Sequence, residues 1–483
     1  CENAKKNGLH IRMSVRELKK PENDKKKNAF LRAWKRIQEL PPDNPNSFWA
    51  IGGFHGEPFR EPLRKDDNPS TPRWGGWCQH ANVLFPTWHR FYLLRLEHAL
   101  RTVCPDDDIA MAYWDATSEE SLKYGLPELL TQDKVEIDGE TVDNPLKSFT
   151  FPEAIAGKEA IEFYEKPKGY TTVRYPYSGI QNPSKAKRIA YKHNKRMRVQ
   201  LSKQNSTSTE ALNANVIHWL TAGENPPTNP MSVLNKFKRC LETPSYNNFS
   251  NTDSFPHTGG VSLESPHNDL HLSIGGFTMD DVHFGLITGS NGDVGENETA
   301  GFDPIFHFLH CNIDRVFWIW QKKHGKTESF DIDPKDEYGT NPSDSQGQGL
   351  TPSQSENEKL SMHTPLAPFQ HANGVPVNST DCIDITKLGY DYTIGSLDKP
   401  TWPPSREVKV TTTDAEDFKA VHALVAKADK SKLRQKFAFN VSDIPELKWY
   451  DSGFTGYSPK ITPIPKYSYP IDPDYVYHSG EKK

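Results

Sequence analysis

The chain has 483 residues, of which 35% are hydrophobic and 25% charged, with a formal net charge of −5 and a mean hydropathy of −0.74. No apolar run approaches the roughly 18 residues that a membrane-spanning helix needs, so we expect no membrane partner. The basic runs Lys19-Lys20 and Lys25-Lys26-Lys27 are short and mixed with acidic residues, which argues against a nucleic-acid partner. Composition does not separate a monomer from a homo-oligomer.

Apolar residues recur at helical spacing in several stretches, and polar or proline-rich segments separate them. They predict helices over residues 28–40, 85–102, 187–201, 208–222, 263–272 and 303–323. Residues 41–77 are predicted to be rich in loops, residues 118–185 to form surface structure, and residues 325–360 to form a long surface loop. Residues 405–483 begin with strand-like alternation and end in a tail rich in Tyr and Pro.

A first cluster of histidines lies in the N-terminal quarter of the chain. His55 stands in a Phe-His-Gly string within the loop-rich segment, and His80 follows Cys78 by two residues. His89 lies on the helix predicted over residues 85–102, whose apolar pattern indicates burial. Three buried imidazoles are enough to hold one metal ion.

A second cluster lies farther along the chain. His267 and His271 are spaced i, i+4, so a helix presents both imidazoles on one face. His310 lies on the helix predicted over residues 303–323, within an apolar stripe. Neither cluster contains a thiolate pair or a carboxylate, and three imidazoles per ion favour copper among the transition metals. If the clusters face each other, dioxygen can be held between two metal ions.

A buried histidine taken singly is more often a hydrogen-bonded core residue than a metal ligand, but two ordered clusters of three are poorly explained in that way. His98, His283 and His307 lie near the clusters without matching a ligand position. We expect them to pack against the ligands or to hydrogen-bond them, and His307, three residues before His310, is the first to examine.

Taken together, these strings resemble the coupled binuclear (type 3) copper proteins, which comprise tyrosinases, catechol oxidases and molluscan-type hemocyanins. The likeness runs from about residue 10 to about residue 400 and is strongest to fungal and bacterial tyrosinases with a Cys-x-His motif. One position departs from the pattern, because Leu309 stands where the family often has a second histidine beside His310.

The resemblance implies a mainly α fold, in which a four-helix bundle holds two copper ions (CuA and CuB) and a loop-rich region surrounds it. It places CuA on His55, His80 and His89, places CuB on His267, His271 and His310, and makes O2 the co-substrate of a small phenol. It also implies a catalytic domain over residues 1–404 and a small β-containing extension over residues 405–483. That extension is a candidate lid, with Phe454 or Tyr457 as candidates for the inserted residue. It is shorter than in fungal relatives and lacks their cysteine motif, so ordinary surface packing of these two residues is the favoured alternative.

Further residues gain roles from the same resemblance. Glu264 and Asn268 stand where tyrosinases place the pair that orients a water molecule as a base for the phenol. Phe306 is expected to pack between the copper sites. Cys78 stands at the spacing at which the family forms a thioether with the imidazole of His80, which would fix that ring.

Three functions share such a centre. A tyrosinase hydroxylates monophenols to o-diphenols and oxidises these to o-quinones, which makes it the first choice here because Glu264 and Asn268 are both present. A catechol oxidase or o-aminophenol oxidase performs only the second reaction. A hemocyanin-like oxygen carrier performs neither, and the short chain argues against it.

Two further features concern the ends of the domain and the compartment. Tyr390-Asp391-Tyr392 matches a family motif whose usual partner is an N-terminal arginine, for which Arg12 is best placed. The chain starts at Cys1 and carries five Asn-x-Ser/Thr sequons, which gives a modest preference for secretion over a cytoplasmic location. If Cys78 forms the thioether, the other five of the six cysteines allow at most two disulfides.

Overall fold

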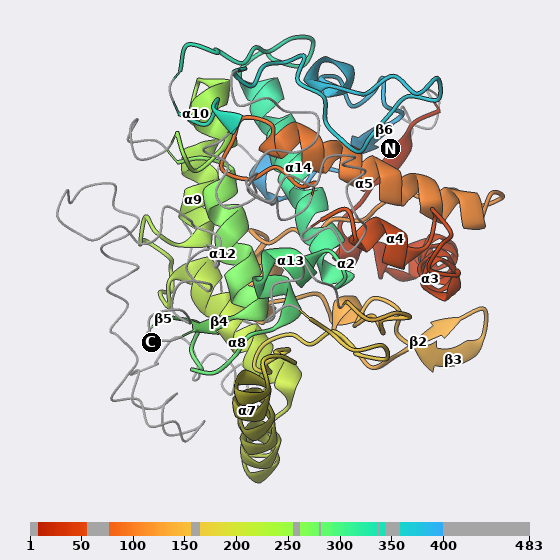
Figure 1. The fold of residues 1–483 in the computed structure, drawn as a ribbon, viewed down its shortest axis with the longest axis vertical. Helices are drawn as coiled ribbons and strands as arrows, with labels where there is room; N and C mark the ends of the chain where they lie inside the picture. The colour runs from red at the N-terminus through yellow and green to blue at the C-terminus, as the bar shows by residue number, and fades with distance from the viewer. Residues whose placement is uncertain are drawn as a thin grey trace.

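Helices supply most of the regular structure in the computed structural model, which describes residues 8–55, 77–155, 165–254, 261–279, 282–336, 338–342 and 358–398 (Figure 1). The α-helices of these residues are α2 (Val15–Leu18), α3 (Asp24–Glu39), α4 (Phe48–Gly52), α5 (Phe85–Val103), α6 (Glu119–Tyr124), α7 (Ser184–Lys203), α8 (Ser208–Thr221), α9 (Val233–Cys240), α10 (Tyr246–Ser250), α12 (Glu264–Gly275), α13 (Asn297–Ala300) and α14 (Ile305–Lys323). No helix of the described residues is both long enough and apolar enough to cross a bilayer.

Strands are short and occur in pairs within the described residues. β1 (His10–Arg12) runs parallel to β6 (Tyr390–Tyr392), whereas β2 (Lys134–Ile137) with β3 (Glu140–Asp143) and β4 (Phe277–Met279) with β5 (Val282–Phe284) form antiparallel hairpins. The described residues also form short 3₁₀ helices: η1 (Pro21–Asn23), η2 (Glu128–Leu130), η4 (Asp293–Gly295), η6 (Ser379–Cys382) and η7 (Ser396–Asp398). The predicted mainly α-helical class is therefore confirmed.

Local sequence explains where the long helices begin and end. Pro86 stands in the first turn of α5, where a missing backbone N–H costs no hydrogen bond. A capping box of Thr207 and Glu210 starts α8. Gly276 caps the C-terminal end of α12, and its φ of +68° suits glycine. Just before it, a Cβ on Gly275 would lie 2.1 Å from the backbone nitrogen of Gly295, so only glycine allows that close approach.

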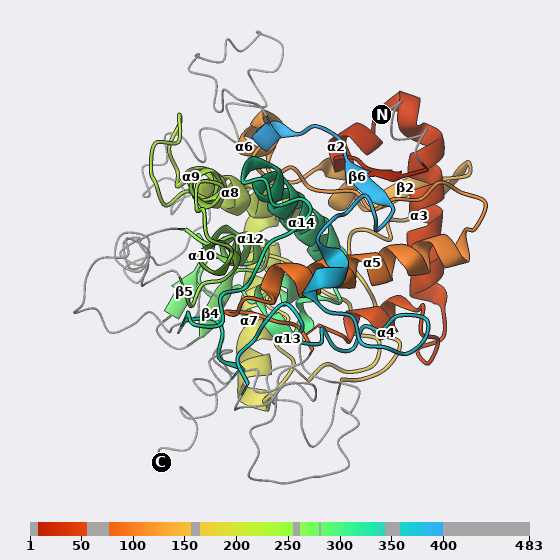
Figure 2. The same ribbon diagram turned by 90° about the horizontal axis from the view of Figure 1, so that it is seen from above.

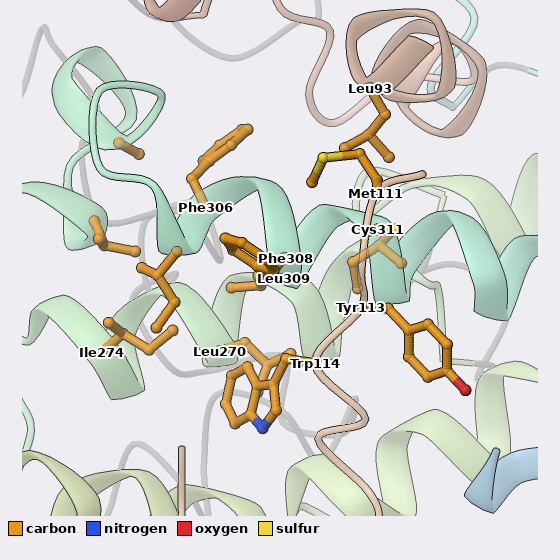
Figure 3. Close-up of a cluster of buried hydrophobic side chains, with 14 of the residues drawn as sticks. Leu93, Met111, Tyr113, Trp114, Leu270, Ile274, Phe306, Phe308, Leu309 and Cys311 are labelled. Carbon is orange, nitrogen blue, oxygen red and sulfur yellow. The ribbon is translucent and has the colours of Figure 1, made fainter. Parts of the chain in front are cut away.

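The four central helices pack in the order α3, α5, α14, α12, and α8 covers the far side of α12 (Figure 2). Figure 3 shows part of the core between them, where Phe308 and Leu309 of α14 lie near Leu270 of α12, and Leu93 of α5 lies beside Met111. All five side chains are fully buried. Burial of this kind stabilises the fold by roughly 1.5–3 kcal/mol for each large apolar side chain.

The pairing of β1 with β6 brings together residues near the two ends of the described chain. The guanidinium of Arg12 lies 3.6 Å from the ring centroid of Tyr390 and donates a hydrogen bond of 2.9 Å to the hydroxyl of Tyr392. It also pairs with the buried carboxylates of Glu97 and Asp314. The predicted link between Arg12 and the Tyr-x-Tyr motif is thus confirmed, and it closes the domain around the central helices.

The prediction of surface structure over residues 118–185 is wrong for much of that stretch. Leu130, Leu146, Phe149 and Phe151 are all buried, and the ring of Phe149 lies 4.8 Å from that of Phe48. The apolar residues are scattered among prolines and charges without period, which hid their burial from a periodicity argument. Residues 405–483, with the predicted lid and its Phe454 and Tyr457, lie outside the described residues, as does the predicted domain boundary at residue 404.

Candidate metal centre

The six predicted ligand histidines form two compact triads. His55, His80 and His89 make the first triad, and His267, His271 and His310 make the second. Within each triad the ligand nitrogens lie within 4.8 Å of one another, and all six residues are buried. Both sets are close enough for one ion each.

The supporting backbone differs between the triads. In the first, only His89 lies on a long helix, α5, whereas His55 follows α4 in a turn and His80 stands in irregular chain before α5. In the second, all three ligands project from the long helices α12 and α14.

Hydrogen bonds at Nδ1 fix the tautomer of four ligands. His55 donates to the carbonyl of Asn297 at 3.0 Å, His89 to that of Phe85 at 2.8 Å and His271 to that of Val294 at 2.7 Å. His267 donates from Nδ1 to the side-chain oxygen of Asn268 at 2.8 Å. A proton held at Nδ1 leaves Nε2 with its lone pair, which is the form of imidazole that binds a metal.

Those lone pairs converge without enough protons to bond one another. In the second triad, Nε2 of His310 lies 3.0 Å from Nε2 of His267 and 3.2 Å from Nε2 of His271, although the protons of both partners are held at Nδ1. In the first triad, the buried Nε2 atoms of His55 and His89 have no hydrogen-bond partner among the described residues. A proton on Nε2 of His310 can bond to only one of its two neighbours, so buried acceptors remain that face one another without a donor. Such acceptors suit a shared cation, and this donor set fits copper.

Burial also keeps the imidazoles neutral. It lowers the pKa of His89 and of His271 to about 3. The pKa values of His55, His267 and His310 fall well below the ordinary value, because burial and then the neighbouring imidazoles disfavour a charge there. At neutral pH these ligands therefore need not release a proton to bind a metal.

The triads face each other, with aromatic rings packed against both. The imidazoles of His89 and His310 stack at 4.5 Å between ring centroids. Phe306 stacks on His310 at 4.0 Å and meets His55 edge-on at 4.5 Å, so it contacts both triads where the sequence placed it. Phe85 does the same from α5, at 4.8 Å from His89 and from His267. Sequence reasoning missed the contacts of Phe85, although its place four residues before His89 on one helix face is a usable signal.

Glu264, at the start of α12, is buried beside the first triad. Its Oε1 accepts from the backbone N–H of Ala81 at 2.8 Å, and its Oε2 accepts from the backbone N–H and the hydroxyl of Thr252 at 2.8 and 3.0 Å. Burial raises its pKa to about 7, in spite of these donors. A carboxylate offers about four acceptor positions, so the three bonds leave room for one further donor. Asn268 orients the ligand His267, as already described.

A single segment positions one ligand of each triad. Residues 294–297 run from within η4 to the first residue of α13, and two of their carbonyls, those of Val294 and Asn297, hold His271 and His55. Sequence reasoning missed this segment, because a backbone carbonyl leaves no mark in the amino-acid sequence.

Buried polar contacts anchor that segment at Asp293. Its Oδ2 accepts from the hydroxyl of Tyr170 at 2.6 Å and from the backbone N–H of Val173 at 2.8 Å. Its Oδ1 lies 3.4 Å from the ammonium of Lys166, which is also buried. These contacts tie the segment to the chain before α7.

The remaining predictions near the triads have mixed outcomes. His307 is fully buried, but Nε2 bonds to the carbonyl of Gly301 at 3.1 Å and its ring packs on Trp34 and Tyr92, so its contacts are those of a core residue. Cys78 is buried with its sulfur 3.8 Å from the side-chain nitrogen of Asn297. All five cysteines of the described residues are free of disulfides.

Comparison with known proteins gives the same assignment from independent evidence. A family model described as the common central domain of tyrosinase matches residues 45–323. The tyrosinase HcTyr2 of Hahella sp. (strain CCB-MM4) is 43% identical over 422 residues, which are 82% of this chain and 75% of that protein. A tyrosinase of Aspergillus oryzae (strain ATCC 42149 / RIB 40) is 40% identical over 79% of this chain and 72% of its own length.

A solved structure supports the same conclusion. The tyrosinase from Burkholderia thailandensis, determined at low pH, superimposes with a TM-score of 0.72 at 44% sequence identity. The superposition covers 85% of this chain and 77% of that one.

Proposed function

Because this chain belongs to the tyrosinase family and is a copper phenol oxidase, we propose that it carries out both tyrosinase reactions, the hydroxylation of monophenols and the oxidation of o-diphenols to o-quinones with O2. His55, His80 and His89 would hold one copper ion, and His267, His271 and His310 the other. Bound copper supplies the electrons that reduce dioxygen. The protein supplies neutral imidazoles and an apolar surround.

The protein must also manage the proton of the phenol. A phenol has a pKa of about 10 and must lose its proton before its oxygen can bind a metal. Glu264, with a pKa raised to about 7, is a far better proton acceptor at neutral pH than an ordinary carboxylate. Its remaining acceptor position can hold a water molecule that passes the proton from the phenol hydroxyl to the carboxylate. This placement of Glu264 carries the proposal.

A second candidate, an oxidase limited to o-diphenols, also has an observation in its favour. Two of the three donors to Glu264 are backbone N–H groups, those of Ala81 and Thr252, so the carboxylate already has a role in holding the fold. If that is its whole role, the enzyme lacks a base for monophenols. The same centre then oxidises only catechols or o-aminophenols, which ionise more readily.

Substitution of Glu264 separates the two candidates. In Glu264→Gln the amide keeps an acceptor for one neighbouring N–H but cannot take up a proton. General-base assistance contributes roughly a hundredfold to ten-thousandfold, so oxygen uptake with a monophenol should fall by about that factor relative to uptake with a catechol. Thr252→Val is the matched control, because it removes one donor and leaves the carboxylate.

Each outcome of that experiment favours one candidate. An equal loss on both substrates in Glu264→Gln would assign the residue to the fold. The absence of monophenol oxidation by the copper-loaded parent protein would favour the oxidase limited to o-diphenols. Asn268→Leu gives a second test, because it leaves Glu264 in place while removing the oxygen that orients His267.

A further inference from the structure

Helix α7 has a charge unlike that of the rest of the chain. Its residues 184–203 include eight Lys and Arg and no Asp or Glu, whereas the whole chain has a net charge of −5. The basic residues are Lys185, Lys187, Arg188, Lys192, Lys195, Arg196, Arg198 and Lys203. Over a helix about 30 Å long, this is a dense positive charge with no acidic residue on the helix itself.

The basic residues lie on the solvent side of α7. Its buried residues Ala190, His193, Met197 and Leu201 follow helical spacing and form one stripe against the protein. All eight basic side chains are exposed. Figure 1 shows α7 extending from the lower end of the molecule, away from α14.

Half of these basic residues have no acidic partner among the described residues. Within the part of the chain that the structure describes, no ion pair is formed by Lys185, Lys187, Lys192 or Lys195, whereas Lys134 of β2 and Lys147 do pair with carboxylates. Exposed like charges that have no ion pair among the described residues, as at these four lysines, are suited to an external polyanion.

Apolar side chains are exposed among the charges. Ile189 is 58% exposed, Tyr191 64% and Val199 47%. Only three other large hydrophobic residues of the described chain are exposed, Tyr124, Val375 and Ile394, and they lie on separate segments. Val199 continues the row of Arg188, Lys192 and Lys195 along one face of the helix. Apolar and basic groups therefore share one surface.

We propose that the solvent face of α7 is a docking surface for an anionic lipid bilayer. Anionic headgroups complement the lysines and arginines, and the interfacial region accepts Ile189, Tyr191 and Val199. A nucleic acid offers the phosphates but no apolar phase for these side chains. The expectation of no membrane partner rested on the lack of a spanning segment, and such a segment is not needed for docking at the surface.

Docking would also serve the oxidation of phenols. A ring with one polar group prefers the interface between lipid and water, as the side chains of Tyr and Trp do. An enzyme held at that interface meets apolar phenols where they accumulate, so oxidation of such phenols should speed up when anionic vesicles are added.

Vesicle co-sedimentation of the full-length protein tests the charge contribution. Vesicles of phosphatidylcholine containing phosphatidylserine should bind the protein, and vesicles of phosphatidylcholine alone should not. A basic residue near an anionic surface contributes roughly a fivefold factor, so the triple variant Arg188→Gln/Lys192→Gln/Lys195→Gln should bind about a hundredfold more weakly. The triple variant Lys20→Gln/Lys25→Gln/Lys35→Gln removes the same charge near α3 and should bind like the parent protein.

Substitution of the apolar residues decides between lipid and nucleic acid. Ile189→Ser/Tyr191→Ser/Val199→Ser should weaken vesicle binding about tenfold or more, since each buried CH₂ contributes roughly 0.8 kcal/mol, and should leave catechol oxidation in solution unchanged. Equal binding to neutral vesicles, or equal losses in both charge variants, would overturn the proposal. Tight binding of duplex DNA that ignores the apolar substitutions would identify the surface as a nucleic-acid interface instead.

Discussion

The two histidine triads reach similar geometry by different means. In the second triad, α12 and α14 set the positions of all three ligands, and the i, i+4 spacing of His267 and His271 fixes their separation. In the first triad, His55 and His80 stand on irregular backbone, and only His89 gains its position from a helix. Irregular backbone places a side chain less precisely than a helix does, so the first triad depends more on contacts from other parts of the chain.

Those contacts come from the half of the chain that carries the second triad. Asn297 holds His55 through its carbonyl, and Glu264 holds the backbone N–H of Ala81, directly after His80. Ala81 has a φ of +51°, a conformation that costs a residue other than glycine roughly 1–2 kcal/mol. The hydrogen bond from Ala81 to Glu264 offsets that cost. The first triad therefore depends on hydrogen bonds from the half of the chain that carries the second triad.

The segment at residues 293–297 holds one ligand of each triad, so weakening its anchor at Asp293 should lower copper affinity at both triads alike. Asp293→Asn removes the charge that faces Lys166 and weakens the bonds from Tyr170 and Val173. Loss of a contact that orients a metal ligand typically lowers metal affinity by roughly 10–100-fold. Copper affinity should fall by about that factor at both triads, since the segment holds one ligand of each. Copper titration of the metal-free protein against a chelator measures both affinities.

A second buried carboxylate controls for general destabilisation. Glu97→Gln disrupts a buried pair with Arg12 toward the C-terminal end of α5, about two turns beyond His89, and should lower thermal stability without changing either copper affinity. If Asp293→Asn behaves like Glu97→Gln, or weakens one triad alone, residues 293–297 do not position the two triads jointly.

This segment also marks the limit of what the sequence predicts. The two clusters of histidines and the long helices that carry four of them follow from residue types and spacing. Their assignment as copper ligands and the pairing of Arg12 with the Tyr-x-Tyr motif came from the family resemblance. Asp293 and Asn297 lie in a run rich in Gly, Asn, Asp and Glu, which is typical of surface loops, yet both are buried. Tertiary contacts decide that burial, and spacing along the chain cannot indicate them.

The charged surface of helix α7 likewise could not be predicted from the sequence. Its helical pattern predicted residues 187–201, close to the observed bounds Ser184–Lys203. The basic residues are interrupted by Ile189, Tyr191 and Val199, so the chain shows no continuous basic run of the kind that indicates a polyanion site. Only the rotation of the helix, with Met197 and Leu201 turned inward, collects the charges on one side.

The thioether proposed between Cys78 and His80 should matter to the first triad alone. A covalent bond would supply the fixation that irregular backbone does not give His80. Cys78→Ser should therefore weaken copper binding at the first triad by about tenfold and leave the second unchanged. In the parent protein, intact mass should be lower by the hydrogens lost on bond formation, and Cys78 should resist alkylation. Full alkylation after metal removal and reduction would show that the bond is absent.

The smallest expected effect is a pH dependence at Glu264, the residue that joins the two halves of the site. Its pKa of about 7 means that the carboxylate is mostly ionised at pH 8 and mostly protonated at pH 6. Only the ionised form accepts the phenol proton, so the ratio of monophenol to catechol oxidation should fall about tenfold as pH falls from 8 to 6. Catechol oxidation depends less on this base and serves as the internal reference.

Substitution removes the source of that pH dependence. Glu264→Gln has no titrating group, so its low ratio should stay constant over the same pH range. A ratio that falls equally in the parent protein and in Glu264→Gln would assign the pH dependence to another group. A flat ratio in the parent protein would mean that Glu264 is held in one protonation state by Ala81 and Thr252. Its contribution to the first triad would then be the hydrogen bond from Ala81 alone.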